Sequence, residues 1–460
     1  MGNKKNAWLK FDNTKKEEIF SFCEGYKKYI SDCKTERESI KEAIYLAESK
    51  GYRDLKNVIS AGKSLKAGDK VYYNNMDKSL ALFLIGSESI ESGMRIIGSH
   101  VDSPRLDLKP NPLYEDSELS LMETHYYGGV KKYQWVTIPL ALHGVVVKKD
   151  GTKIDVVVGE EETDPVVMVS DLLVHLASEQ QQKKATEVIA GEDLNILVGS
   201  MPLEGEEKEA VKANILKLLK EKYDFEEEDF MSAEIEIVPA GKARDLGLDR
   251  SMVAGYGHDD RICAYTSLLA LLETESTKKT SVVLLVDKEE VGSIGATGMQ
   301  SRFFENAVAE LMDRVGEYSE LKLRRALANS KMLSSDVTAA FDPNYAGAYE
   351  KKNSAFFGKG LAFAKYTGAR GKSGCNDANA EFVAWLRNVM DESDVSYQMA
   401  ELGKVDQGGG GTIAYILAEY GMEVIDCGVA LQNMHAPWEV ASKVDIFETM
   451  RGYKAFLMAE

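Results

Sequence analysis

Short apolar segments that end abruptly in acidic or histidine side chains most limit how this chain can fold. MRIIGSHVD (94–102) and SVVLLVDKEE (281–290) each indicate a buried strand followed by polar residues, and ANSKMLSSD (328–336) repeats the form. Segments with helical period, such as 260–275, alternate with these strands. Alternating strands and helices predict an α/β sandwich, in which helices cover both faces of a sheet.

A block in the middle of the chain follows a different pattern. Between residues 105 and 240, segments such as YQWVTIPLALHGVVV (133–147) have β character, and a Lys-Asp-Gly turn at 149–151 follows one of them. This pattern predicts strands joined by hairpins. We therefore expect an α/β domain interrupted by an inserted β-rich domain, with the three segments at 1–106, 107–244 and 245–460.

Composition excludes several classes of protein. The chain has 56 basic and 74 acidic residues and a net charge of -18. A negative field of this size repels phosphate groups, so we expect no binding to nucleic acids or anionic membranes. The longest apolar runs, such as 138–142 and 282–286, fall far short of the ~20 residues of a membrane span. The first eighteen residues lack the apolar core of a secretory signal.

The cysteines indicate the cellular compartment. Their number is odd, their spacing is wide, and no Cys-x-x-Cys pair occurs among Cys23, Cys33, Cys263, Cys375 and Cys427. This pattern supports neither a disulfide framework nor a zinc ribbon. Reduced thiols are typical of the cytoplasm. With 44% hydrophobic residues, we expect a globular cytoplasmic protein.

Side chains of metal-ligand type follow several predicted strands. In open α/β sheets the carboxyl ends of the strands face the ligand crevice, so such residues converge even when they are far apart in sequence. Two histidines and three carboxylates are a suitable ligand set for zinc or a mixed-metal site. One shared carboxylate would hold two ions roughly 3.5–4 Å apart. The candidates are His100, Asp102, Asp259, Asp260, Glu289, Glu290, Asp336 and His435.

Each of these residues also has a structural interpretation. His100 alone could be a hydrogen-bonded structural histidine, and Asp259 with Asp260 could cap a helix. The Glu289–Glu290 pair could be a solvated strand end, and Asp336 could begin a turn. Their shared position at the ends of predicted strands favours the metal site. Three other histidines, His125, His143 and His258, are expected to have structural roles. His175 is considered below.

Several motifs together resemble the M18 family of metallo-aminopeptidases, of the aspartyl-aminopeptidase type. The resemblance covers nearly the whole chain and keeps the order of the motifs. In the inserted block, YGG (127–129), Trp135 and LALHGVVV (140–147) also resemble the family. The other matching segments are GSHVDSPRLDLKP (98–110), DDR (259–261), DKEEVGSIGATG (287–298), SSDVTAAFDPN (334–344), GGGTIA (409–414) and MHAPWEV (434–440).

The resemblance implies a role for each candidate in the hydrolysis of N-terminal residues from peptides. Two Zn²⁺ ions per subunit are implied, with Co²⁺ or Mn²⁺ as substitutes. Their implied ligands are His100 and Asp336 for one ion, Glu290 and His435 for the other, and Asp259 for both. Glu289 is the implied general base, which takes a proton from water and passes it to the leaving amine. Asp102, two residues from His100, suits an orienter of that imidazole.

Two further residues enter through the resemblance. His175, in LLVHLA (172–177), matches a family histidine that reaches the active site of a neighbouring subunit; the alternative is a histidine on the packing face of a helix. Lys365 matches a family lysine near the substrate's first side chain. The family's partner tyrosine has no counterpart, since GKSGCND (371–377) stands there, so we expect neutral or basic N-terminal residues to be accepted as well as acidic ones.

The resemblance also implies that the inserted domain is a dimerisation domain. Family members assemble into large hollow homo-oligomers built from dimers, up to a dodecamer, and we expect the same of this chain. Two other functions fit the same ligands: an M42- or M20-like metallohydrolase, such as a glutamyl aminopeptidase or a deacylase, and a non-catalytic metal-binding scaffold. Glu289 argues against the scaffold, because a pure binder does not need a general base beside its ligands.

Overall fold

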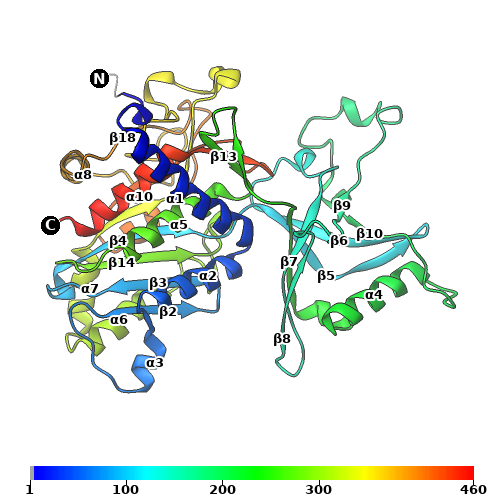
Figure 1. Ribbon diagram of the computed structural model, residues 1–460, viewed down its shortest axis with the longest axis horizontal. Helices are drawn as coiled ribbons and strands as arrows, with labels where there is room; N and C mark the ends of the chain where they lie inside the picture. Colours follow the sequence, from blue (N-terminus) through cyan, green and yellow to red (C-terminus); the bar gives the residue numbers. More distant parts are fainter. Residues whose placement is uncertain (1–4) are drawn as a thin grey trace. The chain divides into compact units, whose positions relative to one another are not determined.

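The computed structural model describes residues 5–460 and divides the chain into two compact units, and Figure 1 labels many of their helices and strands. The first unit runs up to Asp102 and continues over Ala243–Met434 and Glu439–Glu460. The second unit comprises Ser103–Lys242 and His435–Trp438. Residues 1–4, the start of the N-terminal segment that was compared with a secretory signal, lie outside the described residues. The assignment of His435–Trp438 to the second unit is a feature that the sequence did not suggest.

A nine-stranded mixed sheet forms the centre of the first unit. Its four middle strands, β14, β4, β15 and β19, run parallel, and the strands on either side of them, β3 and β17, are antiparallel. Parallel neighbours need crossover connections, which helices provide here. The strand order is β1 (Arg53–Asp54), β2 (Lys70–Asn75), β3 (Ser79–Leu84), β14 (Thr280–Val286), β4 (Met94–His100), β15 (Lys331–Ser335), β19 (Glu423–Gly428), β17 (Leu361–Ala364) and β18 (Tyr397–Met399).

Alternate residues of the middle strands enter two different cores, one on each face of this sheet. On β14, Val283 and Leu285 belong to one core and Val282 and Leu284 to the other, and all four are fully buried. Burial on both faces explains why these strands are continuous apolar runs in the sequence.

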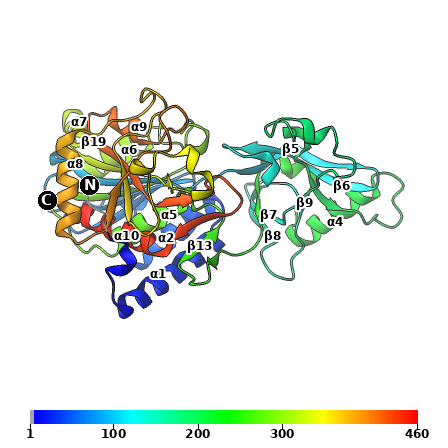
Figure 2. The ribbon, with the colours of Figure 1, turned by 90° about the horizontal axis from the view of Figure 1, so that it is seen from above.

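Helices cover both faces of the sheet, and Figures 1 and 2 show the helices of the two layers. The first core includes α2 (Glu36–Ser49), α5 (His258–Leu272), α8 (Ala380–Glu392) and α10 (Lys443–Met458); the second includes α3 (Leu55–Ser60), α6 (Phe303–Arg314), α7 (Glu320–Ala328) and α9 (Ala414–Ala418). The α/β class predicted from the sequence is confirmed.

Local capping explains where the first helices begin. The side chain of Asp12 accepts a hydrogen bond from a backbone N–H of α1 (Asn13–Asp32). Thr35 and Glu38 form a capping box at the start of α2, which separates it from α1. The sequence also predicts Ser442 as the N-cap of the last helix. Ser442 does occupy that position before α10, although its side chain makes no capping hydrogen bond.

A smaller five-stranded sheet completes the first unit. Asp336 lies between β15 and this sheet, and its backbone N–H donates to the carbonyl of Cys427 at 2.8 Å. Cys427 belongs to β19, so the nine-stranded sheet holds Asp336 itself. The pairing of Thr338 with Ala430 in the smaller sheet holds the chain two residues further on. The strands of the smaller sheet are β12 (Arg244–Leu246), β13 (Met252–Gly255), β21 (Glu439–Ser442), β20 (Ala430–Gln432) and β16 (Thr338–Ala339).

The second unit is the predicted β-rich block. It contains a seven-stranded antiparallel sheet and the charged helix α4 (Ala210–Tyr223). Arg105, at the start of β5, pairs with Asp107 at 2.7 Å and with Glu236 at 3.2 Å, so the chain is bonded into this unit from its first strand. The strand order is β8 (Lys153–Val158), β7 (Leu140–Val147), β11 (Ala233–Pro239), β5 (Arg105–Asp116), β6 (Leu119–Tyr127), β10 (Ile196–Gly199) and β9 (Met168–Val169).

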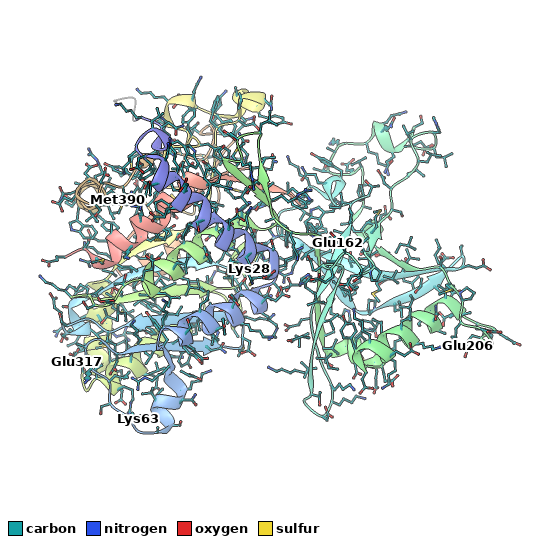
Figure 3. The ribbon with its side chains drawn as sticks, viewed as in Figure 1. Lys28, Lys63, Glu162, Glu206, Glu317 and Met390 are labelled. Carbon is teal, nitrogen blue, oxygen red and sulfur yellow. The ribbon has the colours of Figure 1, made fainter. Side chains whose placement is uncertain are left out.

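Charged side chains project from both units, for example Lys28 and Lys63 in the first and Glu162 and Glu206 in the second (Figure 3). No helix within residues 5–460 is long and apolar enough to span a membrane. All five cysteines are free thiols, and four of them are buried.

A buried group of ion pairs surrounds Asp245 in the first unit. Its carboxylate lies 2.7 Å from the Nζ atoms of Lys27 and Lys443 and 2.6 Å from Nε of Arg250. The side chain of Lys443 is 0% exposed. Burial alone would raise the pKa of Asp245, but hydrogen bonds from the three cations outweigh it and hold that pKa well below its usual value. Loss of this carboxylate would leave the buried Lys443 charge uncompensated.

We expect Asp245→Asn to lower the free energy of unfolding at pH 7 by about 3 kcal/mol, as for other broken buried ion pairs. Urea denaturation measures this change, and Asp249→Asn, which alters an exposed carboxylate nearby, is the control. Because the folded-state pKa is lowered, the stabilisation is present above the unfolded-state pKa of about 3.9 and is lost as pH falls below it. Equal stability of the two variants would contradict this role.

Candidate metal centre

The predicted strand ends meet in the first unit. His100 is the last residue of β4, Asp336 follows β15, and Asp259 lies in the first turn of α5. His100 Nε2 is 3.1 Å from Asp259 Oδ1, 3.7 Å from Asp336 Oδ1 and 3.8 Å from Glu289 Oε2. The parallel strands β4, β14 and β15 end at the same edge of the sheet, which brings together residues that are far apart in sequence.

Asp102 connects the imidazole to the glutamate pair. The Nδ1 atom of His100 donates to the backbone carbonyl of Asp102 at 2.9 Å. The carboxylate of Asp102, which is 0% exposed, accepts the backbone N–H groups of Glu289 and Glu290, each at 3.2 Å. When Nδ1 donates and the ring is neutral, the lone pair is on Nε2, the nitrogen that faces the carboxylates and would bind a metal. Asp102 thus orients the ring through its backbone and the glutamates through its side chain.

The side chains have the spacing of metal ligands. In two groups of three, a ligand atom from each residue lies within 4.8 Å of the others: His100 with Asp260 and Asp336, and His100 with Asp259 and Glu290. Two ligands at 2.0–2.1 Å from a tetrahedral zinc ion lie about 3.3 Å apart, close to the distances around His100 Nε2. Imidazole and carboxylate donors suit zinc. The residues therefore fit divalent metal ions.

Electrostatics point to the same conclusion. Burial raises the pKa of Glu289 to about 8, and the charges of Asp336 and Asp102 add to the effect although His100 opposes it. Burial also raises the pKa of Asp260 well above its usual value, with repulsion from Asp336 as the next cause. The side-chain oxygens of Asp260 have no hydrogen-bond partner within the described part of the chain. So many buried carboxylates need a compensating cation, which a divalent ion provides.

A tight turn after β14 carries the glutamate pair. The strand ends at Val286, and Lys288, Gly292 and Ser293 have φ values of 71°, 95° and 59°. The Ser293 N–H donates to the Lys288 carbonyl at 2.6 Å and closes the turn. Consecutive residues of a strand point to opposite faces. Since the strand has already ended, Glu289 and Glu290 can serve the same site.

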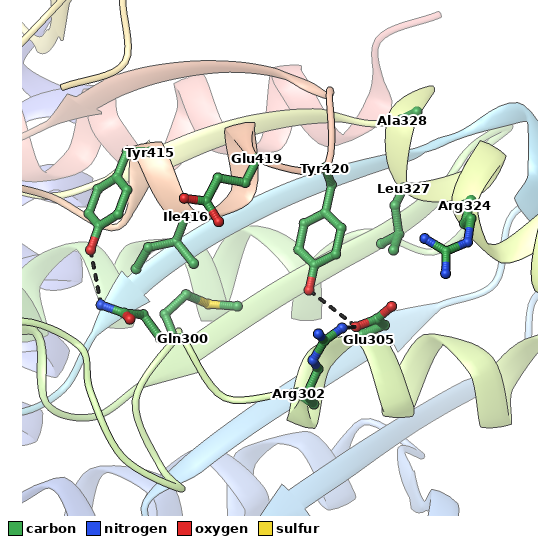
Figure 4. Close-up of a pocket in the computed structure, with 11 residues that line it drawn as sticks. Gln300, Arg302, Glu305, Arg324, Leu327, Ala328, Tyr415, Ile416, Glu419 and Tyr420 are labelled. Atoms are coloured by element: carbon green, nitrogen blue, oxygen red, sulfur yellow. Dashed lines mark hydrogen bonds and ion pairs between the residues drawn. The ribbon is translucent and has the colours of Figure 1, made fainter. Parts of the chain in front are cut away.

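A separate pocket of about 550 Å³ borders this turn (Figure 4). Gln300 Nε2 donates to the carbonyl of Gly292 and to the hydroxyl of Tyr415 on α9, each at 3.0 Å. Gln300 thereby ties the end of the glutamate turn to a helix. None of the site residues predicted from the sequence lines this pocket. Its lining is Met299, Gln300, Arg302, Glu305, Arg324, Leu327, Ala328, Tyr415, Ile416, Glu419 and Tyr420.

His435 belongs to the second unit, whereas the other proposed ligands belong to the first. Its Nδ1 atom lies 2.9 Å from the carbonyl oxygen of Gly129. When Nδ1 donates to this carbonyl, Nε2 is the nitrogen that can bind a metal. The role of His435 as a ligand stays a prediction.

His175 lies in an exposed turn of the second unit and not on the packing face of a helix. Its neighbours form an exposed apolar run, with exposures of 47–69% for Leu172, Leu173, Val174 and Leu176. Contiguous exposed apolar side chains commonly mark an interaction surface. The location of His175 is therefore compatible with a role at a subunit contact, which stays a prediction.

Lys365 is not one of the side chains around His100. It follows β17, which is antiparallel to β19 and pairs Ala364 with Asp426, so the strand leads away from the edge where the parallel strands end. The Nζ atom of Lys365 is 3.8 Å from Asp377, whose carboxylate also pairs with Lys372 at 2.9 Å. The ion pair with Asp377 partly compensates the charge of Lys365.

The other histidines have structural contacts. His258 is buried, its Nδ1 lies 2.6 Å from the hydroxyl of Tyr26, and burial lowers its pKa to about 3. His143 Nε2 is 2.9 Å from Glu160. His125 is exposed, and its Nδ1 donates to the carbonyl of the next residue. These contacts agree with the structural roles expected from the sequence.

The fold and the cluster of carboxylates with histidine are those of a metal-dependent hydrolase. Residues 29–457 match the family model described as Aminopeptidase I zinc metalloprotease (M18). A probable M18 family aminopeptidase 1 of Clostridium acetobutylicum is 66% identical over 454 residues, which are 98% of each chain. The crystal structure of the M18 aminopeptidase of Thermotoga maritima has a TM-score of 0.94 at 45% identity, and that of aminopeptidase I of C. acetobutylicum has 0.93 at 65%; both comparisons cover 99% of each chain.

The chain belongs to the M18 family of zinc metallo-aminopeptidases, and it hydrolyses N-terminal residues from peptides. The family membership predicted from the sequence motifs is confirmed. An M42- or M20-like hydrolase and a non-catalytic scaffold, the alternatives left open by the sequence, are therefore set aside.

Two acidic residues near the centre were not assigned roles from the sequence. A carboxylate oxygen of Asp260 lies within 4.8 Å of ligand atoms of His100 and Asp336. In the sequence, only its position beside Asp259 indicated that it belongs to the site. Glu439 is 1% exposed, and its Oε2 accepts the backbone N–H of Asp259 at 3.0 Å. The only indication of Glu439 in the sequence is a single acid at the start of a short buried strand.

Proposed function

We propose that the aminopeptidase is dinuclear, with two zinc ions per subunit held by five side chains. His100 and Asp336 would bind one ion, Glu290 and His435 the other, and Asp259 both. His100 and Asp336 share one group with ligand spacing, and Asp259 and Glu290 share the other, which supports this division. His100 also belongs to the second group, and Asp260 completes the first. Zinc ions bound here would acidify a water molecule and polarise the scissile carbonyl. Co²⁺ or Mn²⁺ could replace them, since both accept the same nitrogen and oxygen donors.

Glu289 is the proposed general base. Its carboxylate lies 3.8 Å from His100 Nε2, beside the ligands. Burial and neighbouring carboxylates raise its pKa to about 8, and bound cations would lower that pKa toward neutrality. A carboxyl group that titrates near neutral pH can take a proton from water and return it to the leaving amine. The 3.2 Å hydrogen bond from its backbone N–H to Asp102 holds it in place.

The crowding of carboxylates around His100 carries the proposal, and metal removal tests it. We expect about two divalent ions per chain by metal analysis, complete loss of aminopeptidase activity with a strong chelator, and recovery with Zn²⁺, Co²⁺ or Mn²⁺. A fully active sample that contains no bound metal would contradict the proposal. A sample with one tightly bound ion at full activity would contradict the dinuclear part alone.

We also propose that Lys365 affects the choice of the substrate's N-terminal residue. Lys365→Ala should reduce kcat/KM for acidic N-terminal residues more than for neutral ones, by about threefold, because the partly exposed lysine is already paired with Asp377. The unmodified enzyme should also accept neutral or basic residues. A panel of aminoacyl-coumarin substrates measures both effects. Strict hydrolysis of Asp and Glu substrates would contradict the broad preference.

The assembly proposed for the chain is a homo-oligomer built from dimers, up to a dodecamer. The exposed apolar run around His175 supports an interface through the second unit. A dodecamer is the described state of mApe1 of S. cerevisiae, which is 20% identical and has a TM-score of 0.77. We further propose a cytoplasmic location, because the five free cysteines suit a reducing compartment.

A further inference from the structure

A buried glutamate of the smaller sheet, Glu439, contacts a proposed metal ligand without belonging to the ligand set. Glu439 and Asp259 both lie in the first unit and are 1% and 4% exposed. Oε2 of Glu439 accepts a hydrogen bond from the backbone N–H of Asp259 at 3.0 Å. Glu439 is in neither group with ligand spacing. Its contact is with the backbone of a ligand, and residues outside a ligand set can orient ligands through such bonds.

Strand pairing places Glu439 at the beginning of α5. Glu439 is the first residue of β21, where it pairs with Gly255, the last residue of β13. The chain continues from Gly255 into α5, which begins at His258, so Asp259 is only four positions beyond the paired glycine. The register of the smaller sheet therefore brings the side chain of Glu439 beside the backbone N–H of Asp259.

The first turn of α5 needs an acceptor of this kind. The first four N–H groups of an α-helix have no partner within the helix, and the N-cap residue Gly257 has no side chain to accept one. Asp259 also departs from helical geometry, with φ -80° and ψ 106°, so the helix alone does not fix its backbone. Hydrogen bonds to an ionised acceptor are roughly twice as strong as neutral ones. Glu439 therefore anchors the backbone where the helix does not.

The carboxylate of Asp259 depends on the position of this backbone. Its Oδ1 lies 3.1 Å from His100 Nε2, and Asp259 shares a group with ligand spacing with His100 and Glu290. Metal–ligand distances vary by only about 0.2 Å among well-formed sites, so a small backbone shift is enough to weaken a metal bond. Loss of a residue that orients a ligand typically costs about 10–100-fold in metal affinity.

We propose that Glu439 is a positioning residue, which holds the Asp259 carboxylate in place for metal binding through the hydrogen bond to the Asp259 backbone. The inference rests on the proposed function, because it takes Asp259 as a ligand of both ions. The alternative is that the negative charge of Glu439 attracts the metal ions without any effect on Asp259. The two explanations differ in which property of the side chain matters, the acceptor atom or the charge.

Two substitutions separate the acceptor from the charge. Glu439→Gln keeps the length of the side chain and an acceptor oxygen but removes the charge, whereas Glu439→Asp keeps the charge and withdraws the oxygen by one methylene group. Zinc affinity is measured on the metal-free enzyme by competition with a chromophoric chelator. We expect it to stay within about threefold of the unmodified value in Glu439→Gln and to fall about tenfold or more in Glu439→Asp. The visible absorption spectrum of the Co²⁺-loaded enzyme should change only in Glu439→Asp.

Asp445→Asn is the matched control for a change of a buried acid. The carboxylate of Asp445 is 0% exposed and accepts the backbone N–H groups of Gly358 and Gly360 at 2.7 and 2.6 Å. Asp445 is in neither group with ligand spacing, so its substitution should leave zinc affinity unchanged. A loss in Asp445→Asn as large as that in Glu439→Asp would mean that any disturbed buried acid weakens the site, and it would overturn the proposal.

The remaining outcomes separate the positioning role from the proposed function. Unchanged zinc affinity in Glu439→Asp, or an equal loss in Glu439→Gln and Glu439→Asp, overturns the positioning role. If Glu439→Asp does not fold, Glu439→Gln decides alone, because a tenfold loss there contradicts a role of the acceptor atom. Unchanged affinity in Asp259→Ala refutes Asp259 as a ligand and the inference with it. A loss in Asp259→Ala without one in Glu439→Asp refutes the positioning role alone.

Discussion

Glu289→Gln is expected to reduce kcat by about 10²–10⁴-fold while both metal ions stay bound, because a positioned general base contributes about that much to the rate. The amide keeps the size of the side chain and leaves the backbone hydrogen bond to Asp102 in place, since that bond uses the N–H of residue 289. Steady-state kinetics with an aminoacyl-coumarin substrate and metal analysis of the same sample measure the two quantities.

Glu290→Gln is the matched comparison, because the two glutamates are adjacent and both donate their N–H groups to Asp102. Glu290, but not Glu289, belongs to a group with ligand spacing. Its substitution should therefore lower metal content, and added zinc should restore part of the activity. If both variants lose metal to the same extent, the division of roles within the pair is wrong. If Glu289→Gln keeps full activity, another residue is the base.

Most of the fold could be predicted from the sequence because its signals are local. The continuous apolar strands ending at His100 and Val286 are buried on both faces, and that burial itself produces the recognisable pattern. The strand-end rule then predicts that His100, Glu289 and Asp336 meet, since it depends only on parallel strands sharing an edge. Asp259 joins them from the first turn of α5. Short motifs in a characteristic order and spacing identified the family from the same residues.

Other features depend on contacts that the sequence does not encode locally. The orientation of β17 is one: the segment before Lys365 has strand character, but nothing in it indicates pairing antiparallel to β19. The contact of the Asp102 carboxylate with the glutamate turn is another. The sequence predicts Asp102 as an orienter of the imidazole alone, which its backbone carbonyl contacts. The membership of His435 in the second unit arises from its contact with Gly129, 306 positions earlier in the chain.

His175→Ala is expected to lower kcat by about 10²–10³-fold, the usual effect of losing one donor to the oxyanion. The residue lies on an exposed apolar turn of the second unit, with Val174 and Leu176 60% and 69% exposed. Association of two chains through this turn would bury that surface, and His175 would then contact the partner chain. His125→Ala removes another exposed histidine of the same unit and should leave kcat unchanged.

Mixed oligomers test whether the histidine acts on the partner's site. Glu289→Gln and His175→Ala subunits, each nearly inactive alone, are co-refolded at equal concentrations. If His175 acts across the interface, one site of each mixed dimer combines an intact Glu289 with the partner's intact His175. Random pairing makes half of the dimers mixed, so about a quarter of all sites, and of the unmodified activity, should return. If His175 acts within its own chain, each mixed dimer has no complete site and the mixture stays as inactive as its parents. A fully active His175→Ala homo-oligomer would exclude the residue from catalysis.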